Sequence, residues 1–252
     1  MRIKAFSCDK RSLSAKEYLD RELRGLAVGE VMLLPIPTTR DGAHVTGSEV
    51  TLISVASELK SGDIAVGYGL PEEFILACLV RGVTAVDLAL DEEYQKEGAY
   101  LTAAGCIEYI LSEYSIAPNE LAVGVIGYGR IGKALCELLS SLGADVTLYT
   151  SAPSKAVGLK AKLYSELLCV KDLKLDILIN TAPARLIPDG ALIAPYKAEL
   201  IELASGDNMP AGACVTKLMQ LPVRAFPESA GRAVGRAVVR ALISNTDNGA
   251  NL

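Results

Sequence analysis

Short apolar runs alternate along the chain with longer segments in which apolar residues recur every three or four positions. Runs of the first kind are typical of buried parallel strands, and segments of the second kind are typical of the helices that cover them. The pattern therefore predicts an α/β fold with parallel sheets flanked by helices. A first lobe is expected over residues 1–100 and a second over 117–226, with a connecting helix over 101–116 and a last helix over 227–245 that rejoins the first lobe.

The individual elements follow from the same pattern. Strands are predicted at residues 3–6, 31–34, 64–66 and 83–87 in the first lobe and at 122–126, 146–149, 177–180 and 200–203 in the second. Helices are predicted at residues 12–23, 49–59, 72–80, 101–114 and 130–142, and from Pro227 onward. We expect Thr102 to cap the helix over 101–114, because a threonine hydroxyl can accept a backbone N–H at that position.

The last predicted helix carries two further patterns. Gly231 and Gly235 stand four positions apart, which indicates close packing against another helix, since no membrane-length apolar span surrounds them. Three arginines also repeat every four residues and predict a solvated face or, failing that, a partner contact: Arg232, Arg236 and Arg240.

Composition excludes several classes of protein. The 252 residues include 25 Lys and Arg against 30 Asp and Glu, and the basic residues are scattered, which argues against a nucleic-acid partner. No apolar run is long enough for a membrane span, and the N-terminus lacks the apolar core of a signal peptide. The chain has one histidine and six single cysteines, Cys8, Cys78, Cys106, Cys136, Cys169 and Cys214. This usage predicts no metal site, no disulfides, cysteines packed in the core and a cytoplasmic protein.

A glycine-rich motif, G-x-G-x-x-G, lies between the predicted strand over 122–126 and the predicted helix over 130–142. In the dinucleotide-binding fold Gly127 would permit a tight turn, Gly129 would let the backbone approach a pyrophosphate, and Gly132 would let the helix pack on the strand. The alternative is a glycine turn that binds nothing. The context favours two Rossmann-like lobes, with cofactor contacts at Gly127, Tyr128, Gly129, Arg130, Ile131 and Gly132.

The end of the next predicted strand bears on the choice of cofactor. NAD-preferring proteins place a carboxylate there to hold the ribose 2′-hydroxyl. Here the chain offers Thr150, Ser151, Ser154 and Lys155 instead, which can donate hydrogen bonds or positive charge to a 2′-phosphate. We therefore expect NADP rather than NAD, the alternative being that these are ordinary polar loop residues.

Several short motifs follow one another along the whole chain in the order seen in one known family. They lie at residues 7–11, 33–42, 101–105, 127–132, 176–183, 202–205, 221–222 and 227–231. On these motifs the chain resembles the A-subunit family of dipicolinate synthase. Each motif is short, but their colinear order is hard to obtain by chance.

The resemblance implies two lobes around a cleft and an NADP-dependent oxidoreductase that oxidises dihydrodipicolinate, or a related small dicarboxylate, to dipicolinate during sporulation. It implies the mother cell of a sporulating bacterium as the location and a flavoprotein-like partner that forms a second subunit. The first lobe would take the substrate. Further cofactor contacts would come from Thr181, Ala182, Pro183 and Ser205. We also expect a homo-oligomer.

The chain departs from that family beside the expected nicotinamide site. After Ser205 a glycine-rich run is missing and the segment is shorter, Gln220 and Val223 replace two glycines, and Glu202 replaces an aspartate. These departures keep open a different interpretation, a non-catalytic NADP-binding subunit of a similar complex. A dehydrogenase of the hydroxyacid type is less favoured, because no histidine and acid pair is visible in the C-terminal lobe.

Candidates for substrate chemistry lie in the turn after the second predicted strand. A dicarboxylate requires cationic donors, and Arg40 is the first choice because guanidinium binds carboxylates through two parallel hydrogen bonds. Thr38 and Thr39 could add hydroxyl donors. His44 could transfer protons near neutral pH. The alternative for these residues is a solvated turn.

Two other positions are candidates on different grounds. Arg11 matches the first turn of the family, so the resemblance implies a role in substrate binding. Glu228 and Ser229 begin the last helix, where backbone N–H groups could meet a carboxylate or the nicotinamide amide, so they are included with Arg40 and His44 as catalytic candidates. The alternative for Arg11 is a residue that follows a strand and only starts a helix, and the alternative for Glu228 and Ser229 is simple helix capping.

Overall fold

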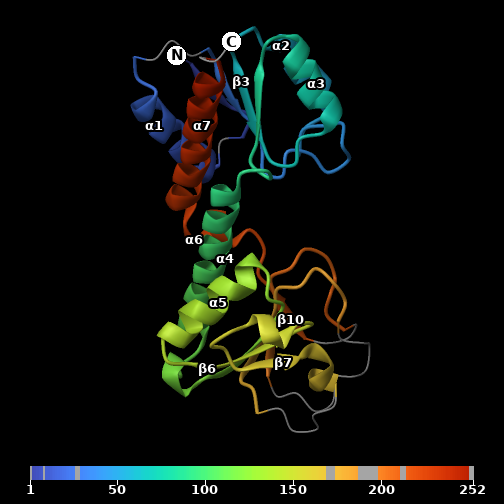
Figure 1. Cartoon of the computed structure of the whole chain (residues 1–252), viewed down its shortest axis with the longest axis vertical. Helices are drawn as coiled ribbons and strands as arrows, with labels where there is room; N and C mark the ends of the chain where they lie inside the picture. The colour runs from blue at the N-terminus through green and yellow to red at the C-terminus, as the bar shows by residue number, and fades with distance from the viewer. Residues whose placement is uncertain are drawn as a thin grey trace. The chain divides into compact units, whose positions relative to one another are not determined.

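The computed structural model describes residues 2–7, 9–25, 29–168, 174–186, 198–210 and 214–249. The chain divides into two compact units (Figure 1). One comprises Met1–Gly98 and Phe226–Leu252, and the other comprises Ala99–Ala225. Each unit is built on a parallel sheet flanked by helices, so the predicted α/β class is confirmed.

The first unit contains a four-stranded parallel sheet in the order β1-β2-β3-β4. Its strands are β1 (Ile3–Ala5), β2 (Val31–Leu33), β3 (Ile64–Gly67) and β4 (Thr84–Asp87). Its helices are α1 (Lys10–Glu22), α2 (Leu52–Glu58), α3 (Glu72–Val80) and α7 (Pro227–Gly249). The last helix thus continues beyond the predicted end at 245.

Alternate residues of these strands face two different cores. Val31, Leu33 and Ile64 pack with α1 and α7 on one face of the sheet. Ala65 of β3 and Leu34, the residue after β2, pack with α2 and α3 on the other face. A sheet covered on both faces explains why its strands read as continuous apolar runs.

α7 packs directly against α1, as the two glycines predict (Figure 1). A Cβ atom on Gly231 would collide with the carbonyl oxygen of Arg11, and one on Gly235 would collide with the ring of Tyr18. Only glycine allows the two backbones to come this close. Ser14 strengthens the contact by donating its hydroxyl to the carbonyl of Glu228 at 3.1 Å.

The arginine stripe of α7 is not the solvated face expected from the sequence. Arg240 donates to both carboxylate oxygens of Asp91, at 2.8 and 3.1 Å, and Arg236 pairs with Glu97. These partly buried pairs join α7 to the start of α4 (Glu92–Glu113). Arg232 remains on the surface, where it pairs with Glu228 one turn earlier.

α4 begins ten positions before the predicted Thr102, which lies in mid-helix. Asp91 provides the N-terminal cap, because its Oδ1 accepts the N–H of Tyr94 at 2.7 Å. Glu92 and Glu93 in the first turn complement the helix dipole. The boundary between the two units falls within this helix, after Gly98.

The second unit contains a six-stranded parallel sheet in the order β10-β9-β8-β5-β6-β7. Its strands are β5 (Ala122–Ile126), β6 (Asp145–Thr150), β7 (Ala161–Leu163), β8 (Ile177–Asn180), β9 (Glu199–Glu202) and β10 (Val215–Lys217). Its helical segments include α5 (Arg130–Ser141), α6 (Leu221–Ala225), η1 (Pro118–Glu120), η2 (Pro153–Lys155) and η3 (Tyr164–Leu168). The short elements β7, β10 and α6 were not predicted. Numbered within the unit, the strands follow the order 3-2-1-4-5-6 of dinucleotide-binding folds.

The cysteines divide between core and surface. Cys78, Cys106 and Cys136 are buried, as expected, and burial raises the pKa of each thiol. Cys214 is exposed, so the core prediction is wrong for it. Cys8 and Cys169 lie outside the described residues. Along the described ranges, no helix has both the length and the apolarity that crossing a membrane requires.

Candidate functional site

The glycine-rich segment lies at the carboxyl edge of the six-stranded sheet. β5 leads directly into Gly127, and α5 starts immediately after Gly129. β8 pairs with β5 and ends beside this segment. The strand order reverses between β5 and β8, and sheets of this kind bind ligands at that point.

The three glycines of the motif have three different physical roles. Gly127 has φ +99°, a left-handed conformation that side chains disfavour. A Cβ atom on Gly132 would collide with the carbonyl oxygen of Gly127, so this glycine brings α5 close to the turn. Gly129 differs from both, because its backbone is ordinary extended chain and a Cβ atom there would meet nothing within 4 Å.

The fold therefore does not require a glycine at position 129. The open space above it is what a pyrophosphate would need in order to reach the backbone. α5 has no side-chain hydrogen bond at its N-terminal cap, and a helix N-terminus of this kind binds phosphate through its N–H groups. These residues fit a dinucleotide cofactor.

The other residues of the motif support the loop. Tyr128 and Ile131 are partly buried and pack on the core beneath α5, and the ammonium group of Lys133 lies 5.0 Å from the ring centre of Tyr128. Arg130 is exposed at the first helical position. The structure therefore places all six residues of the motif around one turn.

Thr181 connects the loop after β8 to the glycine turn. Its hydroxyl donates to the carbonyl oxygen of Ile126 at 2.8 Å, and its N–H donates to the same oxygen at 2.9 Å. Ala182 lies close to Gly127, since a Cβ atom on Gly127 would be 3.2 Å from the Ala182 nitrogen. Pro183 and Ser205 are exposed, after β8 and β9 respectively. All four implied cofactor residues thus follow strands that end at this edge.

The end of β6 presents its polar residues unequally. Thr150 is buried, and its hydroxyl oxygen accepts the N–H of Ala152 at 3.4 Å. Ser151, Ser154 and Lys155 are exposed. These three side chains are therefore the ones that could reach a 2′-phosphate.

A buried pair that the sequence reasoning did not assign to the site lies beside this loop. Glu202 ends β9 with none of its surface exposed, and the Asn180 amide donates to its two oxygens at 3.0 and 3.2 Å. Burial raises the pKa of Glu202, although hydrogen bonds from Asn180, Ala204 and Asn208 and the charge of Lys217 oppose the rise. The sequence feature that could have revealed this pair is a glutamate inside an apolar strand, because a buried carboxylate needs a hydrogen-bond partner.

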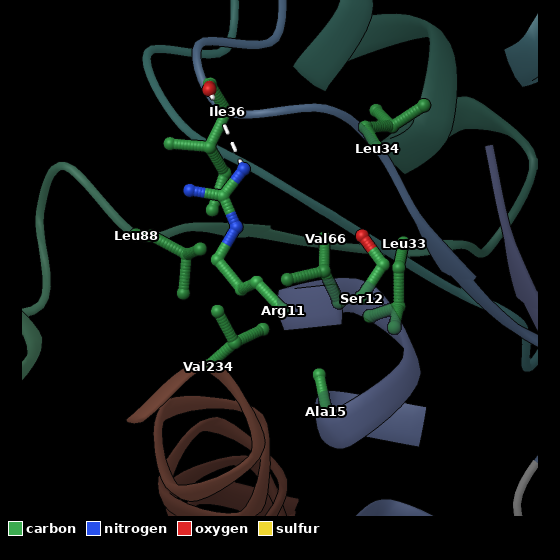
Figure 2. A pocket seen from close by; sticks show the side chains of 9 residues that line it. All are labelled: Arg11, Ser12, Ala15, Leu33, Leu34, Ile36, Val66, Leu88 and Val234. Carbon is green, nitrogen blue, oxygen red and sulfur yellow. Dashed lines mark hydrogen bonds between the residues drawn. The ribbon is translucent and has the colours of Figure 1, made fainter. Parts of the chain in front are cut away.

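Arg11 lies in a small pocket at the carboxyl edge of the first sheet. Figure 2 shows its guanidinium pointing toward Ile36, with Val234 of α7 below it. The walls are mainly apolar: Leu33, Leu34, Ile36, Val66, Leu88 and Val234. The Arg11 side chain is 13% exposed, so this cation has lost most of its water.

The guanidinium of Arg11 is poorly satisfied by the protein. Nη2 lies 3.5 Å from the carbonyl oxygen of Ile36 and 3.5 Å from a carboxylate oxygen of Asp9, the outer limit of a hydrogen bond. Among the described residues, no acceptor lies within hydrogen-bonding reach of Nε or Nη1. The nearby Tyr94 has its pKa raised to about 12 by burial, while the charge of Arg11 acts in the opposite direction. Nε carries one N–H group and Nη1 carries two, so three N–H groups remain for an anion that reaches this small pocket.

The turn that contains Arg40 and His44 forms its own hydrogen-bond network around Asp41. One oxygen of Asp41 accepts the N–H groups of Ala43 and His44, at 2.9 and 2.8 Å, and these bonds lower the pKa of Asp41. Its other oxygen lies 2.8 Å from Nδ1 of His44, which leaves Nε2 as the nitrogen for proton transfer. Arg40 is exposed.

The threonines of this turn stabilise the fold rather than present hydroxyl donors. Thr38 is fully buried, donates to the carbonyl of Pro35 at 3.2 Å and accepts the N–H of Tyr68 at 2.7 Å. The expectation that Thr38 contacts a substrate is therefore wrong. The Thr39 hydroxyl donates to Asp41 at 3.1 Å and accepts the N–H of Gly42 at 3.0 Å, so it too is used within the turn.

Glu228 and Ser229 lie in the first turn of α7. The exposed carboxylate of Glu228 is 3.4 Å from Arg232, and the hydroxyl of Ser229 is 3.3 Å from the same guanidinium. Their side chains therefore meet Arg232. The structure does not bring them into the pocket that Arg11 lines.

A scan against models of known protein families matches none of them, and a search of curated proteins finds no match either. Solved structures do match. The A subunit of dipicolinate synthase from Bacillus halodurans is 19% identical with a TM-score of 0.74, covering 96% of this chain and 97% of that one. The corresponding chain of dipicolinate synthase from Bacillus subtilis is 18% identical with a TM-score of 0.75, covering 98% and 96%.

A D-isomer specific 2-hydroxyacid dehydrogenase from Lactobacillus delbrueckii ssp. bulgaricus, in its NAD complexed form, is 14% identical with a TM-score of 0.55 and covers 98% of both chains. At these identities the comparisons show the fold. The likeness to the A subunit of dipicolinate synthase expected from the motifs is confirmed at that level. The chain has the fold of nicotinamide-dependent dehydrogenases.

Proposed function

We propose that this protein is an NADP-dependent oxidoreductase that oxidises dihydrodipicolinate or a related small dicarboxylate. The observation that carries the proposal is Gly129. The fold does not require a glycine at this position, which lies at the start of α5 where the strand order of the sheet reverses. A bound nicotinamide would supply the hydride chemistry, and the protein would bind and orient the reactants.

The residues of the second unit divide the work of holding the cofactor. Gly127 and Gly132 shape the turn, and the N–H groups at the start of α5 would meet the pyrophosphate. Ser151 and Lys155 would hold the 2′-phosphate that distinguishes NADP from NAD, since the segment 150–155 contains no carboxylate to repel it.

Arg11 is the best candidate for holding a substrate carboxylate. A desolvated guanidinium with unused N–H groups and apolar walls suits a carboxylate on a small ring. Arg40, the first choice from the sequence, is exposed, so its solvated guanidinium would contribute less to binding a carboxylate. His44, oriented by Asp41, would accept or donate the proton through Nε2.

A non-catalytic NADP-binding subunit is the second candidate. Gln220 favours it, because this side chain occupies a left-handed backbone position, φ 57°, where the resembled family has glycine. A side chain there reshapes the segment before α6. The two candidate functions differ in whether the protein turns over substrate. Turnover is measured as NADPH formation at 340 nm with freshly generated dihydrodipicolinate. We expect slow turnover by this chain alone and faster turnover with a flavoprotein-like second subunit, whereas none in either case favours the second candidate.

Calorimetric titration with NADPH and NADH tests cofactor binding. We expect NADPH to bind about tenfold or more tightly, because charge-assisted hydrogen bonds contribute about 1.5–3 kcal/mol. Gly129→Val should abolish binding of both without changing the melting temperature, since the new side chain enters open space. Gly132→Ala should instead lower the melting temperature.

Gly98 offers a matched control, because a Cβ atom there also meets nothing within 4 Å. Gly98→Val should change neither cofactor affinity nor melting temperature by much. Tighter binding of NADH than of NADPH would contradict the assignment of Ser151 and Lys155. Full binding by Gly129→Val would contradict the cofactor site itself.

A further inference from the structure

A buried carboxylate connects two of the loops beside the glycine turn. Glu202 accepts the N–H of Ala204 at 3.0 Å in addition to the amide of Asn180. Taking a carboxylate out of water costs free energy that hydrogen bonds recover only in part. Two apolar residues in place of Glu202 and Asn180 would fill this space at lower cost, so stability alone does not explain the pair.

The orientation of the Asn180 amide is fixed by the backbone of the next loop. Its Oδ1 accepts the N–H of Ala182 at 3.0 Å, and its Nδ2 donates to the carbonyl of Ala182 at 3.1 Å. The remaining N–H of Nδ2 therefore faces Glu202. Only an acceptor at position 202 satisfies this donor, because Asn180 cannot turn around without losing both bonds to Ala182.

The network continues from Ala182 to the glycine turn. Thr181 donates its hydroxyl to the carbonyl of Ile126, and a Cβ atom on Gly127 would lie 2.8 Å from that hydroxyl oxygen. Hydrogen bonds thus lead from the end of β9, through the end of β8, to the end of β5. These are the three strand ends at the proposed cofactor site.

We propose that Glu202 is a positioning residue for the nicotinamide cofactor, acting through Asn180 on residues 181–183 and through the Ala204 N–H on residues 203–205. This inference rests on the proposed function. Glu202 holds the two segments in place before the cofactor arrives, which lowers the entropy that binding would otherwise lose. It is too deeply buried to touch the cofactor itself.

The same strand provides a matched control. Glu199 begins β9, three residues earlier, and accepts hydrogen bonds from the hydroxyls of Tyr109, Tyr114 and Thr216. It therefore ties the amino end of the strand to its surroundings much as Glu202 ties the carboxyl end. Loss of either acceptor should loosen the fold, but only loss at the carboxyl end should affect the cofactor.

The test compares Glu202→Gln, Glu202→Asp and Glu199→Gln with the parent chain, by calorimetric titration with NADPH and by melting temperature without ligand. In Glu202→Gln the new amide would present one neutral oxygen and one N–H group to the donors of Asn180, Ala204 and Asn208, which now meet two carboxylate oxygens. We expect Glu202→Gln to weaken NADPH binding at least tenfold. Glu202→Asp keeps the carboxylate and should bind within about threefold of the parent. Glu199→Gln should bind like the parent while its melting temperature falls by a similar amount to that of Glu202→Gln.

The outcomes separate this inference from the proposed function. If the parent chain does not bind NADPH, both are overturned. If the parent binds and Glu202→Gln binds equally well, or if Glu199→Gln loses as much affinity, only the positioning role is overturned. If Glu202→Gln does not fold, Asn180→Ser replaces it with the same expected loss, and unchanged binding by that variant overturns the inference.

Discussion

Replacing Arg11 with methionine should separate binding from stability. The two contacts that the guanidinium makes, to Ile36 and to Asp9, are both 3.5 Å long and contribute less than the ~1 kcal/mol of a well-formed hydrogen bond. Asp9 keeps the N–H of Ser12 at 2.7 Å and the hydroxyl of Ser7 at 3.1 Å. A methionine would also bury its side chain among the apolar walls without the cost of a desolvated charge.

We therefore expect Arg11→Met to change the free energy of unfolding by less than about 1 kcal/mol, or the melting temperature by less than about 4 °C. Binding of a carboxylate should respond differently. A charge-assisted contact of about 1.5–3 kcal/mol is lost, which weakens affinity about 10- to 100-fold. The variant should thus be as stable as the parent but bind the substrate carboxylate more weakly.

The assay is a calorimetric titration with dipicolinate in the presence of saturating NADPH, beside thermal unfolding without ligand. Arg40→Ala is the comparison, since it removes an exposed arginine of the same unit. Unchanged dipicolinate affinity in Arg11→Met would refute the reasoning, and so would a fall in melting temperature of more than about 10 °C, because the guanidinium would then be holding the fold. If Arg40→Ala loses dipicolinate affinity and Arg11→Met does not, the substrate carboxylate binds at the exposed turn and not at Arg11.

Four further outcomes are expected. Lys155→Ala should weaken NADPH binding by up to about fivefold, as an exposed charge does, and leave NADH binding unchanged in the same titration. Gln220→Gly should raise the free energy of unfolding in urea by about 1 kcal/mol, because the left-handed backbone at φ 57° no longer carries a side chain. Burial raises the pKa of Glu202 above 4.5, so the folded chain holds that proton more tightly than the unfolded chain, and stability falls as pH rises from 4.5 through the raised pKa. Urea titrations across that range should show a smaller fall for Glu202→Gln. His44→Gln and Asp41→Asn should each lower turnover, by about a hundredfold for the histidine, with NADPH affinity unchanged in titration.

Sequence reasoning succeeded where the determining interactions are local. The glycine turn is predictable because each glycine contacts residues within five positions or at the end of the adjacent strand. The motif also includes the strand before the turn and the helix after it. The close packing of α7 was predictable from the spacing of its two glycines. The start of α4 is also marked in the sequence, since Asp91, Glu92 and Glu93 form an N-terminal signature, but the apolar periodicity that predicts the helix begins only further along.

The remaining features depend on residues distant in the sequence. The hydroxyl of Thr38 accepts the N–H of Tyr68, 30 positions away, and this buried contact cannot be inferred from the local sequence. Asn180 and Glu202 are 22 positions apart, and their pairing follows from the register of β8 and β9. Whether Arg11 is exposed or buried depends on the apolar side chains that other elements place around it. No local sequence pattern specifies those neighbours.

The first unit is assembled from both ends of the polypeptide. Val234, Ala237 and Val238 of α7 complete the core that α1 and the sheet begin more than 200 residues earlier. During synthesis on a ribosome, residues 99–225 emerge before this helix does, so the second unit can fold while an apolar face of the first stays uncovered. A chain that stops near residue 226 would keep that face open and aggregate. A circular permutant that joins α7 directly ahead of β1 would instead present the first unit as one continuous stretch of sequence.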